Sequence, residues 1–94
     1  SYVYFNNFKN ANLENTNFKN TELLYANFYL ADFTNADLSG ADLRNTYLGN
    51  ADFTGANLSG ANLEGAVLDN AILTNANLSD ANLNCLGHEI CIVN

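Results

Sequence analysis

The segment Thr54–Asn84 reads TGANLSGANLEGAVLDNAILTNANLSDANLN and places a leucine at every fifth residue. An alanine stands two residues before each of these leucines, and asparagine is the usual residue between the two. A five-residue period matches neither the 3.6-residue turn of a helix nor the two-residue alternation of a strand. Because an internal repeat decides a whole fold, the interpretation starts here.

The same period extends through most of the chain. We define the centre of each unit as its large apolar residue. The centres are Val3, Phe8, Leu13, Phe18, Leu23, Phe28, Phe33, Leu38, Leu43, Leu48, Phe53, Leu58, Leu63, Leu68, Leu73, Leu78 and Leu83. The residue two before the centre is Ala or Thr in every unit from Ala11 to Ala81. The residue directly before the centre is mostly Asn or Asp, and the two after it are mostly small or polar.

Only a coil with corners reconciles this spacing. On a helix, successive centres would step by about 140° and leave no apolar face. On a continuous strand, an odd spacing would send them to opposite faces. We therefore expect short extended segments whose centre and second preceding residue point inward. The next two residues turn a corner, where Gly and Asn tolerate the required backbone angles.

The surface residues predict four sides for each coil. Thr34, Thr54 and Thr74 recur at a spacing of 20, which is four units. Identical residues one coil apart would stack at about 4.8 Å. The sequence thus predicts an all-β, parallel β-helix of about four coils. The expected core includes Phe8, Phe28, Phe33, Phe53, Leu43 and Leu63.

Units such as ADLSG, ADLRN, ANLSG and ANLEG resemble the A(D/N)LXX consensus of the pentapeptide repeat family. The resemblance implies a right-handed quadrilateral β-helix. We expect residues 1–85 to form this β-helix and residues 86–94 to form a C-terminal cap or tail. The first third departs from the consensus, because FKNTELLYANFYL has bulky residues at expected corners.

Composition excludes several kinds of partner. The chain has 94 residues, a net charge of -7, three Lys or Arg and ten Asp or Glu. Without a basic surface, we expect neither direct nucleic-acid binding nor binding to an anionic membrane. No apolar run reaches the roughly 18 residues of a membrane span. The chain starts at Ser1 with no recognisable signal peptide, and we expect it to belong to a longer protein.

Apolar residues at expected surface positions gather near the N-terminus. They form a candidate interaction patch of Tyr2, Tyr4, Phe5, Leu24, Tyr25, Tyr29 and Leu30. Exposed apolar patches usually mark contact surfaces. The patch fits a protein partner, self-association, or coverage by sequence that precedes Ser1. Tyr47, Val67 and Ile72 also replace Asn or Asp before a centre, and we interpret them as tolerated variation.

We expect no catalytic, cofactor-binding or metal-binding residue. Asp32, Asp37, Asp42 and Asp52 form a belt around the coil, whereas a metal site needs converging ligands and acid catalysis needs a pocket. His88 breaks the repeat near Glu89 and Cys91 without matching a catalytic signature. We interpret this segment as an end cap, with Leu86, Ile90 and Ile92 as its apolar contacts.

Cys85 and Cys91 are compatible with two states. They can be free thiols in a cytoplasmic protein, or they can form a disulfide that secures the cap in a periplasmic or lumenal one.

Taken together, these features predict a non-catalytic scaffold or protein-interaction module. The resemblance implies one alternative, since some pentapeptide repeat proteins imitate DNA and bind DNA gyrase as inhibitors or protectors.

Overall fold

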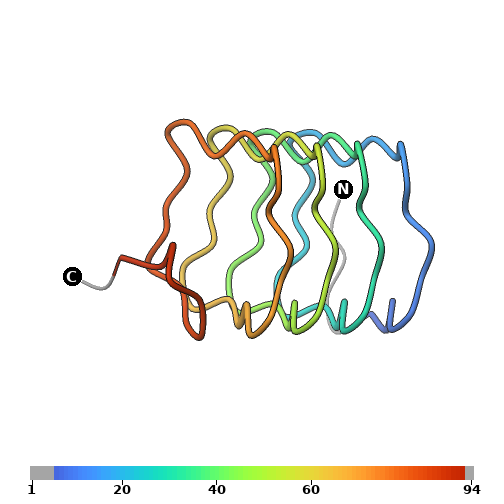
Figure 1. Ribbon diagram of the computed structural model, residues 1–94, viewed down its shortest axis with the longest axis horizontal. Helices are drawn as coiled ribbons and strands as arrows, with labels where there is room; N and C mark the ends of the chain where they lie inside the picture. The colour runs from blue at the N-terminus through green and yellow to red at the C-terminus, as the bar shows by residue number, and fades with distance from the viewer. Residues whose placement is uncertain (1–5, 93–94) are drawn as a thin grey trace.

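A computed structural model describes residues 6–92, and it shows a tube of stacked coils (Figure 1). The coils follow one another along the longest axis, from the blue N-terminal coil at one end to the red coil at the other. The principal extents of the molecule are 29 × 25 × 22 Å. Within residues 6–92 there is no helix and no strand longer than one bridged residue, because a corner interrupts each extended segment after three residues.

Parallel bridges define the period of the coil. They join residues 20 apart, from Asn7 with Asn27 through to Asn62 with Asn82. Four extended segments therefore complete one coil, as the spacing of Thr34, Thr54 and Thr74 predicts. The right hand of the coil remains an expectation from the family resemblance.

Equivalent segments stack into four flat walls, which we name after their first described centre. The centres are Phe8, Phe28, Leu48 and Leu68 in the Phe8 wall; Leu13, Phe33, Phe53 and Leu73 in the Leu13 wall; Phe18, Leu38, Leu58 and Leu78 in the Phe18 wall; and Leu23, Leu43, Leu63 and Leu83 in the Leu23 wall.

Hydrogen bonds between coils satisfy the backbone of the walls. The N–H of the centre Leu48 donates to the carbonyl of Val67 in the next coil at 2.8 Å. The N–H of Asp52, directly before a centre, donates to the carbonyl of Ala31 in the previous coil at 3.0 Å. A corner bond also links coils, from Gly60 N–H to the Ser79 carbonyl at 2.8 Å. The backbone can thus form a stable wall although it makes no long strand.

The interior of the tube is filled by the centres and by the small residues that precede them. Phe33 and Phe53 are fully buried and stack with ring centroids 4.8 Å apart. Fully or almost fully buried side chains include Phe28, Phe33, Phe53, Leu43 and Leu63. Phe8 is only partly buried, because its coil lies at the N-terminal end of the described residues. A lumen filled in this way leaves only the outer walls and the two ends for contact with other molecules.

Each corner depends on two local features. The second residue after a centre adopts a left-handed conformation, as in Asn35 with φ 58° and Gly60 with φ 68°, and Asn and Gly are the residues that adopt it most easily. The residue before the centre caps the turn with a side-chain oxygen, as when Asn57 Oδ1 accepts the Ser59 N–H at 3.0 Å. This cap explains why Asn or Asp usually occupies the position directly before a centre.

The C-terminal end changes the register by one residue. Val67 pairs with Leu86, only 19 positions away, so Cys85 takes the inward position and is fully buried. Cys85 and Cys91 form a disulfide, with their Cα atoms 5.0 Å apart. Ile90 and Cys91 pack against the core.

The predicted apolar contacts of this cap were partly wrong. Leu86 and Ile92 are 52% and 62% exposed. The register shift turns Leu86 outward, because it now pairs with Val67, the outward-facing residue directly before the centre Leu68. The backbone of Ile92, not its side chain, attaches the cap, since its N–H donates to the Leu83 carbonyl at 2.7 Å.

Candidate protein-interaction surface

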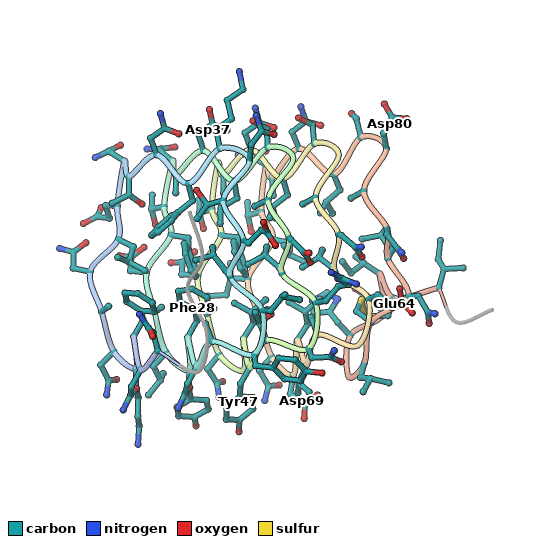
Figure 2. All side chains as sticks on the ribbon, turned by 180° about the vertical axis from the view of Figure 1, so that it is seen from behind. Phe28, Asp37, Tyr47, Glu64, Asp69 and Asp80 are labelled. Carbon is teal, nitrogen blue, oxygen red and sulfur yellow. A yellow bond between two sulfur atoms is a disulfide. The ribbon has the colours of Figure 1, made fainter. Side chains whose placement is uncertain are left out.

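The Phe8 wall carries a column of apolar side chains where the other walls mostly have Asn or Asp. Bridges join Tyr47 to Val67 and Val67 to Leu86, so three consecutive coils contribute to this column. Tyr29 lies beside it, and its ring stacks on that of Tyr47 with centroids 5.4 Å apart. Figure 2 shows Tyr47 and Asp69 on one side of the tube, Asp37 and Asp80 on the opposite side, and Phe28 inside.

Two corner residues extend this column at the edges of the same wall. Tyr25 precedes the second segment of the wall and Leu30 follows it, and they are 50% and 46% exposed. We define the apolar wall as Tyr25, Tyr29, Leu30, Tyr47, Val67 and Leu86. It runs along most of the described tube, so it is longer than the predicted N-terminal patch.

The ring of Tyr29 is held in place by its neighbours. It leans over Gly49, where an added Cβ would lie 3.1 Å from the ring, so the absence of a side chain makes room for it. Asn50 Nδ2 donates to the Tyr29 hydroxyl at 3.2 Å, and Lys9 Nζ lies 5.8 Å from the ring centroid, in the range of a cation–π contact. A fixed aromatic ring loses little conformational entropy on binding, which favours its use in a contact.

The apolar wall departs from both features that stabilise the corners. Tyr47 and Val67 have no short side-chain oxygen, so they cannot cap their turns as Asn57 does. Tyr25 and Leu30 both have φ 61°, a conformation that other corners assign to Asn, Asp or Gly. Residues that break local rules without an evident gain for the fold commonly mark functional sites.

The predicted patch and the apolar wall overlap only in part. Tyr25, Tyr29 and Leu30 belong to both, while Leu24 is half-buried on the neighbouring Leu23 wall. Tyr2, Tyr4 and Phe5 lie outside the described residues. Sequence reasoning missed the rest of the wall, although Tyr47 and Val67 stand 20 residues apart and both replace Asn or Asp. Leu86 gave no such signal, because it stands 19 residues after Val67 and not 20.

Ile72 does not join the apolar wall. It lies on the Leu13 wall, where it pairs with Asp52, and it is 47% exposed.

The acidic belt is used inside the corners. The Asp32 and Asp52 carboxylates accept hydrogen bonds from the backbone and hydroxyl groups of Thr34 and Thr54.

Asp37 and Asp42 of the belt have lowered pKa values, because hydrogen bonds to a carboxylate stabilise its ionised form. The pKa of Asp37 is lowered by hydrogen bonds from the Ser39 hydroxyl and backbone N–H. That of Asp42 is lowered mainly by the Arg44 side chain, whose Nη2 lies 2.8 Å from Oδ2. Among residues 6–92, no group of three or more His, Cys, Asp or Glu side chains could hold a metal ion.

A surface depression of about 330 Å³ lies beside the end of the apolar wall. Its lining residues are Arg44, Asn45, Glu64, Gly65, Asn84 and Leu86. Glu64 is its one carboxylate, and the Arg44 guanidinium is bound to Asp42. The lining therefore does not bring together a nucleophile with a base, or two carboxylates with separate roles.

His88 has a structural role in the cap. Its Nδ1 accepts the N–H of Ile90 at 3.2 Å, and its Nε2 lies 3.0 Å from the Ala71 carbonyl. A neutral ring with the proton on Nε2 satisfies both contacts, accepting at Nδ1 and donating at Nε2. The ring therefore joins the cap to the last full coil.

Comparison with known proteins agrees with this architecture. The family model for pentapeptide repeats matches eight copies, over residues 7–40 and 46–84. The chain belongs to the pentapeptide repeat family. No curated protein matches the chain.

Two solved pentapeptide repeat proteins from the cyanobacterium Nostoc sp. PCC 7120 are similar in structure. HetL, which is involved in the regulation of heterocyst differentiation, is 28% identical with a TM-score of 0.89, and the match covers 93% of this chain and 40% of HetL. The protein alr5209 is 39% identical with a TM-score of 0.82, and the match covers 84% of this chain and 68% of alr5209.

This pentapeptide repeat chain spans 40% of the length of HetL, so the activity of a whole HetL-like protein is not transferred to it. Among residues 6–92, no helix is long and apolar enough to cross a membrane.

Proposed function

We propose that this pentapeptide repeat chain is a non-catalytic scaffold that binds a protein through its apolar wall. The observation that carries the proposal is the contrast between walls. The Phe8 wall replaces turn-capping residues by Tyr47, Val67 and Leu86, whereas the Phe18 wall keeps Asn or Asp at every equivalent described position. The Phe18 wall forms without such apolar residues, which supports a role for them in binding.

The chemistry of the apolar wall supports a protein partner rather than nucleic acid. Tyrosine is enriched in the centres of protein interfaces, because it combines a large apolar area with a polar tip. Within the described residues, only Lys9 supplies a positive charge on this wall, so phosphate groups would find little to bind. The regulatory role of HetL is compatible with a protein that acts by binding.

A photo-reactive phenylalanine analogue at position 47 tests the proposal in the full-length protein. The control carries the same analogue at position 57, on the Phe18 wall, where Asn57 is half-buried at the equivalent place in the repeat. We expect a covalent adduct with one defined polypeptide at position 47 and none at position 57, identified by mass spectrometry of the crosslinked peptides. Equal crosslinking at both positions would show that the wall has no special binding role.

The disulfide supports a second part of the proposal, an oxidising compartment such as a periplasm or lumen. Disulfides persist there and are rare in a reducing cytoplasm. Rapid alkylation of cells with a maleimide, followed by mass measurement, should find Cys85 and Cys91 unmodified. Alkylation of both residues would instead indicate the cytoplasmic alternative.

The gyrase-binding alternative rests on the family resemblance, and no feature of the described walls favours it. Inhibition or protection of DNA gyrase by the purified chain in a supercoiling assay would overturn the present proposal in its favour.

A further inference from the structure

We propose that two copies of this chain associate in antiparallel orientation through the apolar wall. This inference rests on the proposed function, because it identifies the protein bound by the wall as a second copy of the same chain. It is carried by the distribution of charge over the four walls and by the order of residues along one column.

Within residues 6–84, the Phe8 wall is the wall on which the charged side chains cancel. It carries one cation, Lys9, and one anion, Asp69. The other walls hold an excess of carboxylates. These are Glu14, Asp32 and Asp52 on the Leu13 wall, Asp37 and Asp80 on the Phe18 wall, and Glu22, Asp42 and Glu64 on the Leu23 wall. Lys19 and Arg44 only partly offset them, and Glu89 lies in the C-terminal segment.

This distribution favours contact between two Phe8 walls. The whole chain has a net charge of -7, so two copies that met through any other pair of like walls would bring an excess of negative charge together. Like charges facing each other across an interface oppose association. The Phe8 wall, which has the largest set of exposed apolar side chains, is therefore also the wall through which two copies can meet without repulsion between like charges.

The order of charged residues in one column of the wall makes that column complementary to itself. Hydrogen bonds from Asn10 to Tyr29, Leu30 to Gly49 and Asn50 to Asp69 place residues 9, 29, 49 and 69 in one column. Lys9 lies at one end of this column and Asp69 at the other. Among residues 6–92 the ion pair present is Arg44 with Asp42, so neither Lys9 nor Asp69 has an ionic partner.

A two-fold axis across the wall uses this order. In an isologous pair, if residue i contacts residue j of the other copy, then j contacts i. With the axis between the Tyr29 and Gly49 rungs, each Lys9 faces Asp69 of the second copy. The two Tyr29 rings, each leaning over its own Gly49, then meet near the axis. A parallel arrangement would instead oppose Lys9 to Lys9, so the charges select the antiparallel one.

The area of the wall fits a weak dimer. The accessible surface of 4801 Å² is shared by four walls and two ends, so one wall offers on the order of 800 Å², about the contribution of one partner to a standard interface. Not all of that area is apolar, because Asn10, Asn50 and Asn70 line one edge. Since area alone does not fix affinity, we expect association at roughly micromolar concentrations or above.

A charge-exchange experiment tests the antiparallel dimer. Lys9→Glu should bring two carboxylates together at each end of the interface, and Asp69→Lys should bring two ammonium groups together there. Each variant alone should dimerise at least about tenfold more weakly than the wild type in sedimentation velocity. In an equimolar mixture, the two variants can form a heterodimer. At one end of its interface, the unchanged Lys9 of one chain faces the unchanged Asp69 of the other. At the other end, the two substituted positions face each other. Both ends then join opposite charges, so the mixture should dimerise again. Native mass spectrometry should show the heterodimer, and circular dichroism should show that both variants are folded.

Lys19→Glu is the matched control, since it makes the same change of net charge on the Phe18 wall and should leave dimerisation within about threefold of the wild type. Wild-type dimers whose two variants fail to rescue each other would overturn the antiparallel arrangement. A wild-type chain that stays monomeric up to about 1 mM would overturn self-association. The proposed function would survive that second result if the analogue at position 47 still crosslinked to a different polypeptide.

Discussion

At the scale of single residues, the corners explain more of this sequence than the core does. The sequence shows that Asn or Asp precedes most centres, but its pattern alone gives no cause for the acidic belt. Asp32 and Asp52 belong to that belt because they accept hydrogen bonds inside their turns. Much of the acidic character of the chain thus follows from corner geometry. This cause depends on side-chain hydrogen bonds, which residue spacing does not reveal.

A turn-capping residue should have a measurable effect on stability. Asn57→Val removes the oxygen that accepts the Ser59 N–H, and we expect the free energy of unfolding to fall by about 1 kcal/mol. Asn57→Asp keeps an acceptor at the same place and should stay close to the wild type. Urea unfolding monitored by circular dichroism measures both variants. Equal stability of Asn57→Val and Asn57→Asp would refute the capping role.

The lowered pKa of Asp42 makes stability depend on pH. The Arg44 side chain lowers this pKa in the folded chain, so the carboxylate contributes stability above its unfolded value of about 3.9, and this contribution is lost as pH falls through the lower folded pKa. We expect the melting temperature to fall below about pH 4. Asp42→Asn should show a smaller fall over the same range. An identical pH profile for the two proteins would exclude this contribution.

At the scale of elements, the cap shows where sequence reasoning reaches its limit. The break at His88 predicts that the repeat ends near this residue. The one-residue change of register could not be seen, because it depends on a bridge between Val67 and Leu86 at a spacing of 19. That change exchanges the expected roles, so Cys85 lies inside and Leu86 outside.

The disulfide should stabilise the cap more than the coils. Cys85→Ala/Cys91→Ala opens a loop with a sequence separation of 6 but leaves a small residue at the inward position, so we expect a loss of roughly 2 kcal/mol. Hydrogen exchange should rise mainly in residues 86–92 and little in the coils around Phe33. Reducing the wild-type protein serves as the control and should have the same effect. Unchanged exchange in the cap would show that other contacts hold it.

At the scale of the whole molecule, the five-residue period predicts a coil with corners, and the spacing of 20 between surface threonines predicts its four sides. The same alternation predicts Phe33 inside and Thr34 outside, which is where the structure places them. The apolar wall was harder to predict, because its residues come from separate coils and share a face only after the columns are known. From the sequence alone, Tyr47 and Val67 therefore look like tolerated variation.

The filled lumen predicts a sharp difference between adjacent residues. Phe33→Asp removes a ring that stacks on Phe53 and places a charge inside the tube. We therefore expect this variant to be unfolded already at about 25 °C and to show no cooperative transition on heating. Thr34 lies half-exposed on the outer surface, so Thr34→Asn should lower the free energy of unfolding by less than about 1 kcal/mol. Thermal unfolding monitored by circular dichroism compares them, and equal tolerance of both changes would contradict the inward orientation of the centres.

The most direct test of the account is the unfolding free energy of Tyr47→Asn/Val67→Asn, measured in urea at a concentration low enough to keep the chain monomeric. If these residues serve binding and not folding, the two restored turn caps should offset the lost ring stacking, leaving stability within about 1 kcal/mol of the wild type. A loss of about 3 kcal/mol or more would show that the Phe8 wall is apolar because the fold requires it.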